Sequence, residues 1–208
     1  MHVEIITIGS HNQTVDMNDL INTLQKCLQE EIDALTKVME SIDETSVDFA
    51  KVIADCKGKI IFTGVGKSLI VASKIAGTLS SIGIPSTSLN PLGLLHGDLG
   101  FLDAADLIVA LSNSGETDIL INALACARHL NIEILSITGN RASTIASISK
   151  VSIEIKTEEA GPFGLVPTSS TTAMMAFGDA LACALVKLKG LTVNNFYNNH
   201  PNGELSKH

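Results

Sequence analysis

The sequence predicts an α/β fold in which a parallel sheet lies between two layers of helices. Short apolar runs alternate along the chain with longer segments whose apolar residues recur every three or four positions. This alternation leads to right-handed crossovers and a parallel sheet covered on both faces. Only 3% of the 208 residues are aromatic, so Ile, Leu, Val and Ala must build the core, as in helices packed on a parallel sheet. We therefore expect a three-layer sandwich with a five-stranded parallel sheet of the flavodoxin-like or Rossmann-like type.

Two helices are predicted before the first strand of this sheet. Helical periodicity runs from Asp16 to about Glu40 and returns from Ser46 to Cys56. Residues 1–16 are expected to form an N-terminal extension, which is either an ordinary terminus or a small β-structure. Residues 17–208 are expected to form one domain, since no linker, repeat or low-complexity block interrupts them.

The remaining elements follow in strand–helix order. Strands are predicted at residues 59–63, 87–89, 107–111, 134–137 and 151–155. Helices are predicted at residues 68–81, 119–130, 142–147 and 169–188. The tail from Asn194 is polar, and Pro201-Asn202-Gly203 predicts no regular structure there.

Composition excludes several classes of function. The net charge of −8 argues against a nucleic-acid partner, which needs a basic surface. No apolar run reaches the ~18–20 residues that cross a bilayer, and the start of the chain lacks a basic segment followed by a cleavable apolar one. The four cysteines have no CxxC spacing and are expected to be reduced core thiols. We expect a cytoplasmic protein with no membrane partner.

Four loops are the candidate ligand-binding segments. In open parallel sheets, ligands bind beyond the carboxyl ends of the strands. That rule selects residues 64–68, 90–100, 112–117 and 159–170, and these loops also hold the chemically distinctive residues.

The strongest motif is Ser112-Asn113-Ser114-Gly115-Glu116-Thr117, which follows the most apolar strand and opens a helix. A helix N-terminus offers free N–H groups and a favourable dipole to a phosphate. Hydroxyl groups here would complete the cage, and a glycine allows a tight turn. The alternative is a simple N-cap, which one serine would satisfy without the other hydroxyls.

Three other segments carry weaker signals. Gly64-Val65-Gly66-Lys67-Ser68 lacks P-loop spacing, so it is either a simple turn or a source of phosphate and hydroxyl ligands in Lys67 and Ser68. His96 is either a structural hydrogen bonder or a functional residue. Glu158-Glu159 and the hydroxyl-rich 167–172 stretch form either a second helix N-terminal site or an N-cap.

Taken in order, these motifs resemble the arabinose 5-phosphate isomerases, which are sugar isomerase (SIS) domain proteins that make the precursor of the eight-carbon acid Kdo. The resemblance covers about residues 20–205. It rests on Gly64–Ser68, His96–Gly100, Ser112–Glu116, Thr138-Gly139, Gly164-Leu165, Pro167–Thr172, Gly178–Ala182, and His200-Pro201 with Gly203. The HGDLG and PTSSTT blocks are specific to this branch, whereas SNSGE is common to SIS domains.

The resemblance implies reversible isomerisation of D-ribulose 5-phosphate and D-arabinose 5-phosphate through a cis-enediol, without cofactor or metal. The product would supply Kdo biosynthesis for lipopolysaccharide or capsule. The implied catalytic residues are Lys67, Glu116, Glu159 and His200. The implied substrate and phosphate ligands are Ser68, His96, Ser112, Asn113, Ser114, Thr117, Thr168 and Ser169. Glu116, Glu159 and His200 all remain candidates for the base.

Further expectations follow from the same resemblance. The tail histidine implies a homo-oligomer, expected to be a tetramer, whose sites are shared between subunits. The chain stops after the HPxG motif, so a form without CBS domains is expected. Asn90 stands where relatives carry a metal-associated His, so no zinc site is expected. Two alternatives are a non-catalytic SIS sugar-phosphate-binding regulator and an isomerase of a heptose or hexulose phosphate.

Overall fold

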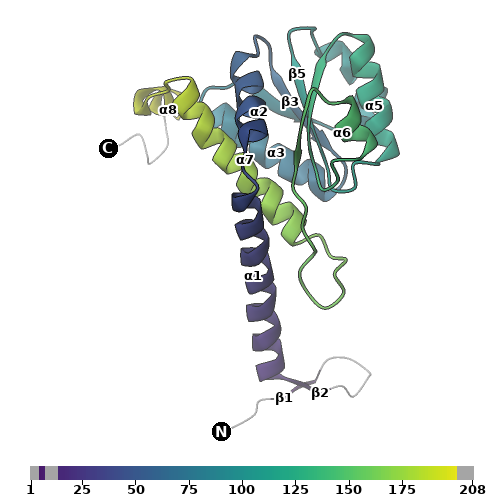
Figure 1. The fold of residues 1–208 in the computed structure, drawn as a ribbon, viewed down its shortest axis with the longest axis vertical. Helices are drawn as coiled ribbons and strands as arrows, with labels where there is room; N and C mark the ends of the chain where they lie inside the picture. The colour runs from purple at the N-terminus through teal and green to yellow at the C-terminus, as the bar shows by residue number, and fades with distance from the viewer. Residues whose placement is uncertain (1–4, 8–13, 201–208) are drawn as a thin grey trace.

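The computed structural model describes residues 5–7 and 14–200, with side chains from Asp16 onward. Helices flank a five-stranded parallel sheet (Figure 1). The strands are β3 (Ile60–Gly64), β4 (Ser86–Leu89), β5 (Leu107–Ser112), β6 (Glu133–Thr138) and β7 (Val151–Glu154). Their order is β4-β3-β5-β6-β7, and every neighbouring pair is parallel. This is the flavodoxin-like order, and it confirms the fold class predicted from the sequence.

Helices cover both faces of this sheet. The end of α1 (Met17–Glu40), with α2 (Glu44–Asp55), α3 (Lys67–Ser81) and α7 (Ser169–Leu188), packs on one face. The short α4 (Pro91–Leu95) and η1 (Asp98–Phe101), with α5 (Asp118–His129) and α6 (Thr144–Ile148), lie on the other side. Successive residues of β5 enter the two cores alternately, and all six are buried. A strand buried on both faces reads as a continuous apolar run, which is why the sequence marks β5 so clearly.

The helices α3 and α7 run in the same direction and touch closely. Both start at the carboxyl edge of the sheet and end at its amino edge, since α3 joins β3 to β4 and Lys189, after α7, bonds to the carbonyl of Ala54 at the end of α2. A side chain at Gly178 would overlap the buried Ile75. This contact places the N-termini of α3 and α7 at the same edge of the sheet.

Of the described helices, α7 has the length and apolar composition of a membrane span, so the expectation that no segment would pass this test was wrong. Its apolar residues serve the protein core. Nine of its twenty residues are buried, and the helix packs against α1, α2 and α3. A helix apolar on most sides is typical of a protein core as well as of a bilayer.

Several features differ from the sequence-based expectations. The polar tail forms α8 (Val193–Asn199), which opens with a capping box between Thr192 and Asn195. By contrast, the N-terminal patch matches one of its two expected alternatives, a small β-structure, because it forms two antiparallel strands, β1 (Ile5–Thr7) and β2 (Thr14–Asp16). The cysteines are free, but none is fully buried, so the prediction of core positions was wrong. Pro201 and Gly203 lie outside the described residues.

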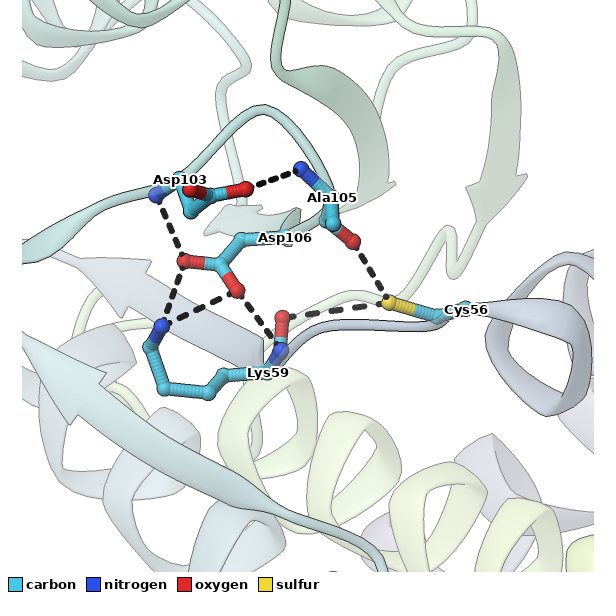
Figure 2. Close-up of polar contacts among 5 residues, drawn as sticks. All are labelled: Cys56, Lys59, Asp103, Ala105 and Asp106. Carbon is cyan, nitrogen blue, oxygen red and sulfur yellow. Dashed lines mark hydrogen bonds and ion pairs between the residues drawn. The ribbon is translucent and has the colours of Figure 1, made fainter.

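A buried carboxylate ties the amino ends of β3 and β5 together (Figure 2). Asp106, only 3% exposed, accepts hydrogen bonds from the N–H of Lys59 at 2.7 Å and the N–H of Asp103 at 2.9 Å. The Lys59 ammonium lies 2.8 Å from the same carboxylate and 4.9 Å from the centre of the Phe101 ring. Burial favours a higher pKa for Asp106, but the hydrogen bonds and the charge of Lys59 outweigh it and lower the pKa.

We expect Asp106→Ala to lower the free energy of unfolding by about 3–5 kcal/mol, because it leaves an ammonium and two N–H groups without their buried partner. Urea denaturation at pH 7 measures this loss. Because the pKa of Asp106 is lowered in the fold, its contribution is present above the ordinary carboxyl pKa of 3.8 and disappears as the pH falls through the folded value. The control is Asp48→Ala, which removes an exposed ion pair with Lys51 and should cost below about 1 kcal/mol.

Candidate functional site

The candidate site lies where the strand order reverses. β3 is followed by a crossover to β4 on one side, while β5 lies on its other side, so the loops after β3 and β5 diverge at the carboxyl edge. Gly64 and Leu111 are register partners at this edge. Ligands bind at such topological switch points. The two loops that meet there are residues 64–68 and 112–117, as expected from the sequence.

The loop after β5 leads into a helix whose N-terminus is open. Thr117 is the N-cap residue of α5, but its side chain does not cap the helix. Instead its hydroxyl lies 3.0 Å from that of Ser112, which also accepts the N–H of Gly115 at 3.1 Å. The first N–H groups of α5 therefore remain available to an anion. The side chains of Asn113 and Ser114 are exposed beside them.

Two glycines allow this loop to pack closely against the loop that follows β6. Gly115 has a φ of +69°, and a side chain on it would overlap Ser143 and lie 2.8 Å from the hydroxyl of Thr138. A side chain on Gly139 would overlap the Asn113 side chain and lie 2.7 Å from the Asn113 carbonyl. The N–H of Gly139 donates to that carbonyl at 2.9 Å. The conformation of residues 112–117, the anion loop, therefore depends on the loop that follows β6.

Glu116 points from the anion loop towards the start of α6. One oxygen of its carboxylate accepts the N–H of Thr144 at 2.8 Å. Hydrogen bonding from the Thr144 backbone and side chain lowers the pKa of the exposed Glu116 carboxyl below its usual 4.5. Glu116 is therefore an ionised carboxylate at neutral pH.

Lys67 and Ser68 lie on the other side of the switch point, in the first turn of α3. The N-cap residue of this helix is Gly66, with φ +60°, which provides no side-chain cap. Lys67 is exposed and Ser68 is half-buried. Since α3 starts at the carboxyl edge of β3, its first turn lies beside the loop after β5.

His96 ends the short helix that follows β4. It is the C-cap residue of α4, its N–H donates to the carbonyl of Gly93 at 2.9 Å, and its side chain is exposed. α4 packs along α5, the helix that begins at the anion loop. Asn90 accepts the N–H of Leu92 at 2.9 Å and so caps the start of α4.

Glu159 caps the N-terminus of α7. Its carboxylate accepts the N–H of Thr168 at 2.9 Å, the N–H of Ser170 at 3.1 Å and the Ser170 hydroxyl. Partial burial would raise the pKa of Glu159, but these hydrogen bonds lower it below the usual 4.5. The carboxylate therefore occupies the helix N-terminus that the sequence had offered as a second anion site.

The hydroxyls around Glu159 serve the scaffold in this conformation. Thr168 accepts the N–H of Ala160 at 2.8 Å, and its hydroxyl contacts the carbonyls of Ala160 and Val166 and the Glu159 carboxylate. Ser169 is fully buried, and its hydroxyl has no hydrogen-bond partner among the described atoms. Neither hydroxyl is exposed to a ligand as Ser114 is.

His200 lies at the opposite edge of the sheet from the other candidates. Its neighbour Asn199 donates to the carbonyl of Ser81, the last residue of α3. α3 has 15 residues, and at 1.5 Å per residue its ends are about 20 Å apart. Within one chain, His200 is therefore far from Lys67 at the start of that helix.

The His200 ring has a defined orientation. It stacks on the Phe196 ring with centroids 4.0 Å apart, and its Nδ1 lies 2.8 Å from the Phe196 carbonyl oxygen. A carbonyl only accepts hydrogen bonds, so Nδ1 carries the proton and Nε2 is the free nitrogen. A histidine in this state offers Nε2 as a base or acceptor.

Residues 5–7 and 14–200 contain no group of three or more His, Cys, Asp or Glu side chains arranged to hold a metal ion. The Glu116 and Glu159 carboxylates accept hydrogen bonds from backbone N–H groups.

The sheet order, the open helix N-terminus and the hydroxyl-lined loop define an α/β protein with a candidate anion site at the switch point of the sheet. A family model described as SIS domain matches residues 52–184. The chain therefore belongs to the SIS domain family.

Several relatives within this family are similar over nearly the whole chain. The arabinose 5-phosphate isomerase KdsD of Pseudomonas aeruginosa is 37% identical over 190 residues, which are 91% of this chain and 58% of that protein. KdsD of Francisella tularensis is 38% identical over 93% of this chain and 60% of its own length. The chain thus spans about three fifths of these two relatives. A solved Escherichia coli CFT073 protein in complex with arabinose 5-phosphate is 35% identical, with a TM-score of 0.86, over 90% of this chain and 100% of that one.

Two residues of the site were not singled out in the sequence. Ser143 is fully buried, caps α6 through the N–H of Ala146 at 3.3 Å, and packs against Gly115. Thr144 contributes its N–H to Glu116. A serine before a short helical segment is an ordinary capping signal, and nothing in the sequence places that helix against the anion loop.

We expect Gly115→Ala to destabilise the fold and to weaken phosphate binding about tenfold or more. The left-handed backbone would cost about 1–2 kcal/mol with a side chain, and the overlap with Ser143 would cost about 1–3 kcal/mol more. Thermal unfolding and calorimetric titration with inorganic phosphate measure the two effects. The control is Gly77→Ala in α3, where a side chain meets nothing within 4 Å. A Gly115→Ala protein that binds phosphate like the control would contradict this account of the loop.

Proposed function

We propose that the chain is a cytoplasmic aldose–ketose isomerase that interconverts D-ribulose 5-phosphate and D-arabinose 5-phosphate, supplying Kdo biosynthesis for lipopolysaccharide or capsule. The observation that carries the proposal is the open N-terminus of α5, lined by the Ser112 and Thr117 hydroxyls, at the switch point of the sheet. The names of the curated relatives and the solved complex with arabinose 5-phosphate support the choice of substrate.

The proposed substrate binds with its phosphate at the N-terminus of α5. The cage consists of Ser68, Ser112, Asn113, Ser114 and Thr117, and His96 contacts the sugar. The dipole of α5 favours a dianion there. Lys67 adds a positive charge beside the phosphate or beside the enediolate oxygen that forms during the reaction. Thr168 and Ser169 also contact the substrate in this proposal, and these contacts require the loop before α7 to open.

The proposed reaction moves one proton between neighbouring carbons and needs no cofactor. In the ketose-to-aldose direction a base removes a proton from C1, O2 is protonated, and a cis-enediol forms. O1 then loses its proton as C2 receives one, which gives the aldose. Glu116 and Glu159 have lowered pKa values, so both are bases rather than acids at neutral pH. The free Nε2 of His200 is the third candidate for the base.

The proposed active unit is a homo-oligomer, with a tetramer expected, because His200 is about 20 Å from Lys67 within one chain. Figure 1 shows α1 extending away from the sheet. Along this projecting part, Leu24, Leu28 and Ile32 are 67%, 62% and 54% exposed. A contiguous apolar stripe of this kind marks a protein–protein contact.

We expect the purified protein to interconvert the two pentose phosphates without added metal or cofactor. In D₂O the product should carry deuterium at the carbon that receives the proton, which NMR detects. Ser112→Ala combined with Ser114→Ala should raise KM because it removes two phosphate ligands. Substrate binding without isomer or label would identify a non-catalytic regulator, and turnover of only a heptose or hexulose phosphate would refute the pentose assignment.

The pH profile of the same assay identifies the class of base. A carboxylate base keeps kcat at saturating substrate constant down to about pH 4.5, since the pKa values of both carboxyls are lowered from 4.5. A fall in kcat between pH 7 and pH 5 would instead assign proton abstraction to an imidazole.

We expect mixed oligomers of two inactive variants to recover activity if His200 acts in a neighbouring subunit's site. His200→Ala and Lys67→Ala should each lose most turnover. After unfolding and refolding together, some sites combine an intact Lys67 from one chain with an intact His200 from another. Steady-state assays of the mixture measure the recovery.

The matched control mixes Lys67→Ala with Glu116→Ala, a second variant expected to lose most turnover. Both positions lie at the same carboxyl edge of one chain, so every site in that mixture lacks one residue and activity should stay low. Equal recovery in both mixtures, or none with His200→Ala, would contradict a site shared through His200.

A further inference from the structure

A second polar cavity lies between the α1–α2 corner and the edge strand β7, and the proposed reaction does not use it. Its volume is about 120 Å³, and it is partly open to solvent. This is below the ~300–1,000 Å³ of sites for drug-sized ligands, so it suits a small ligand of few heavy atoms. The end of α1, the start of α2, the segment 152–156 and Arg141 all line it. The anion loop does not contribute to its lining.

Three cations line this cavity: Lys37, Arg141 and Lys156. Within the described part of the chain, no carboxylate lies within 4.0 Å of the Lys37 or Lys156 ammonium. Arg141 has only a long contact, with its Nε 3.8 Å from Glu154. With the two carboxylates that also line it, Asp43 and Glu154, the cavity carries a net charge of +1, whereas the whole chain carries −8.

The two carboxylates that line the cavity are already engaged by backbone groups. Asp43 caps α2 by accepting the N–H groups of Thr45 and Ser46. Glu154 accepts the N–H of Arg141 at 2.8 Å. Since Asp43 also fills the N-terminus of α2, an anion here would be held by the cationic side chains and by the Ser46 hydroxyl.

Arg141 connects this cavity to the proposed active site over three residues. Its own N–H is fixed to Glu154 at the cavity wall. Ser143, two residues on, packs against Gly115 of the anion loop, and the N–H of Thr144 holds Glu116 at 2.8 Å. A ligand that draws the Arg141 side chain inward therefore acts on the segment that positions Glu116.

We propose that this cavity binds a small organic polyanion of the carboxylate or phosphate class, and that its occupancy alters the active site through the 141–144 segment. The binding part stands by itself, whereas the effect on catalysis rests on the proposed isomerase function.

Isothermal titration of the full chain with citrate tests the binding. Lys37→Ala combined with Lys156→Ala should weaken citrate binding about tenfold or more. The charge-matched control combines Lys51→Ala with Lys57→Ala, two exposed lysines outside the cavity, and should bind citrate like the wild type. Thermal unfolding confirms that both double variants remain folded.

The outcomes separate this site from the anion loop. Equal citrate affinity in all three proteins, or no binding of citrate to the wild type, overturns the proposal. For the coupling, saturating citrate should change KM or kcat in the wild type but not in the Lys37→Ala, Lys156→Ala protein. If the protein has no isomerase activity, the proposed function fails while the titration still decides whether the cavity binds anions.

Discussion

The architecture of the site depends on the close backbone contact between the loops that follow β5 and β6. Gly115 can adopt its left-handed conformation and lie against Ser143 only because it has no side chain. That contact fixes the turn which leaves the first N–H groups of α5 open to an anion, and it brings the start of α6 within reach of Glu116. The anion loop and the segment behind it therefore form one rigid unit. Removing the contact would alter both the phosphate cage and the position of a candidate base.

The Glu159 carboxylate determines whether the N-terminus of α7 can bind an external anion. Without Glu159, the N–H groups of Thr168 and Ser170 would present a second anion site beside α3. With Glu159 bound to both, the negative charge is supplied from within the chain and α7 starts at a fixed position. The consequence for chemistry is that the pKa of Glu159 is lowered rather than raised. A substrate that displaced these hydrogen bonds would free the carboxylate and return its pKa towards the ordinary value.

The sequence predicted the fold well because the buried strands and amphipathic helices have strong periodic signals. β5 is buried on both faces, and its apolar run is unmistakable. The short α8 was missed because its stability comes from a capping box and from tertiary contacts rather than from an apolar stripe. The anion loop could be predicted from its residues and its position after a strand. The lowered pKa values of Glu116 and Glu159 could not, because they depend on N–H groups 28 and 9 or more residues away in sequence.

The position of His200 bears on whether the functional unit is one chain or an oligomer. Lys67 is the first residue of α3, and His200 lies near the other end of that helix. No side-chain rearrangement spans the distance of about 20 Å between them. If both residues serve one reaction, they must come from different chains. The exposed apolar residues on the projecting part of α1 give such an assembly a driving force, because burying them removes apolar surface from water. Association would then have two roles, stabilising α1 and bringing the Nε2 of one chain's His200 to the anion loop of another.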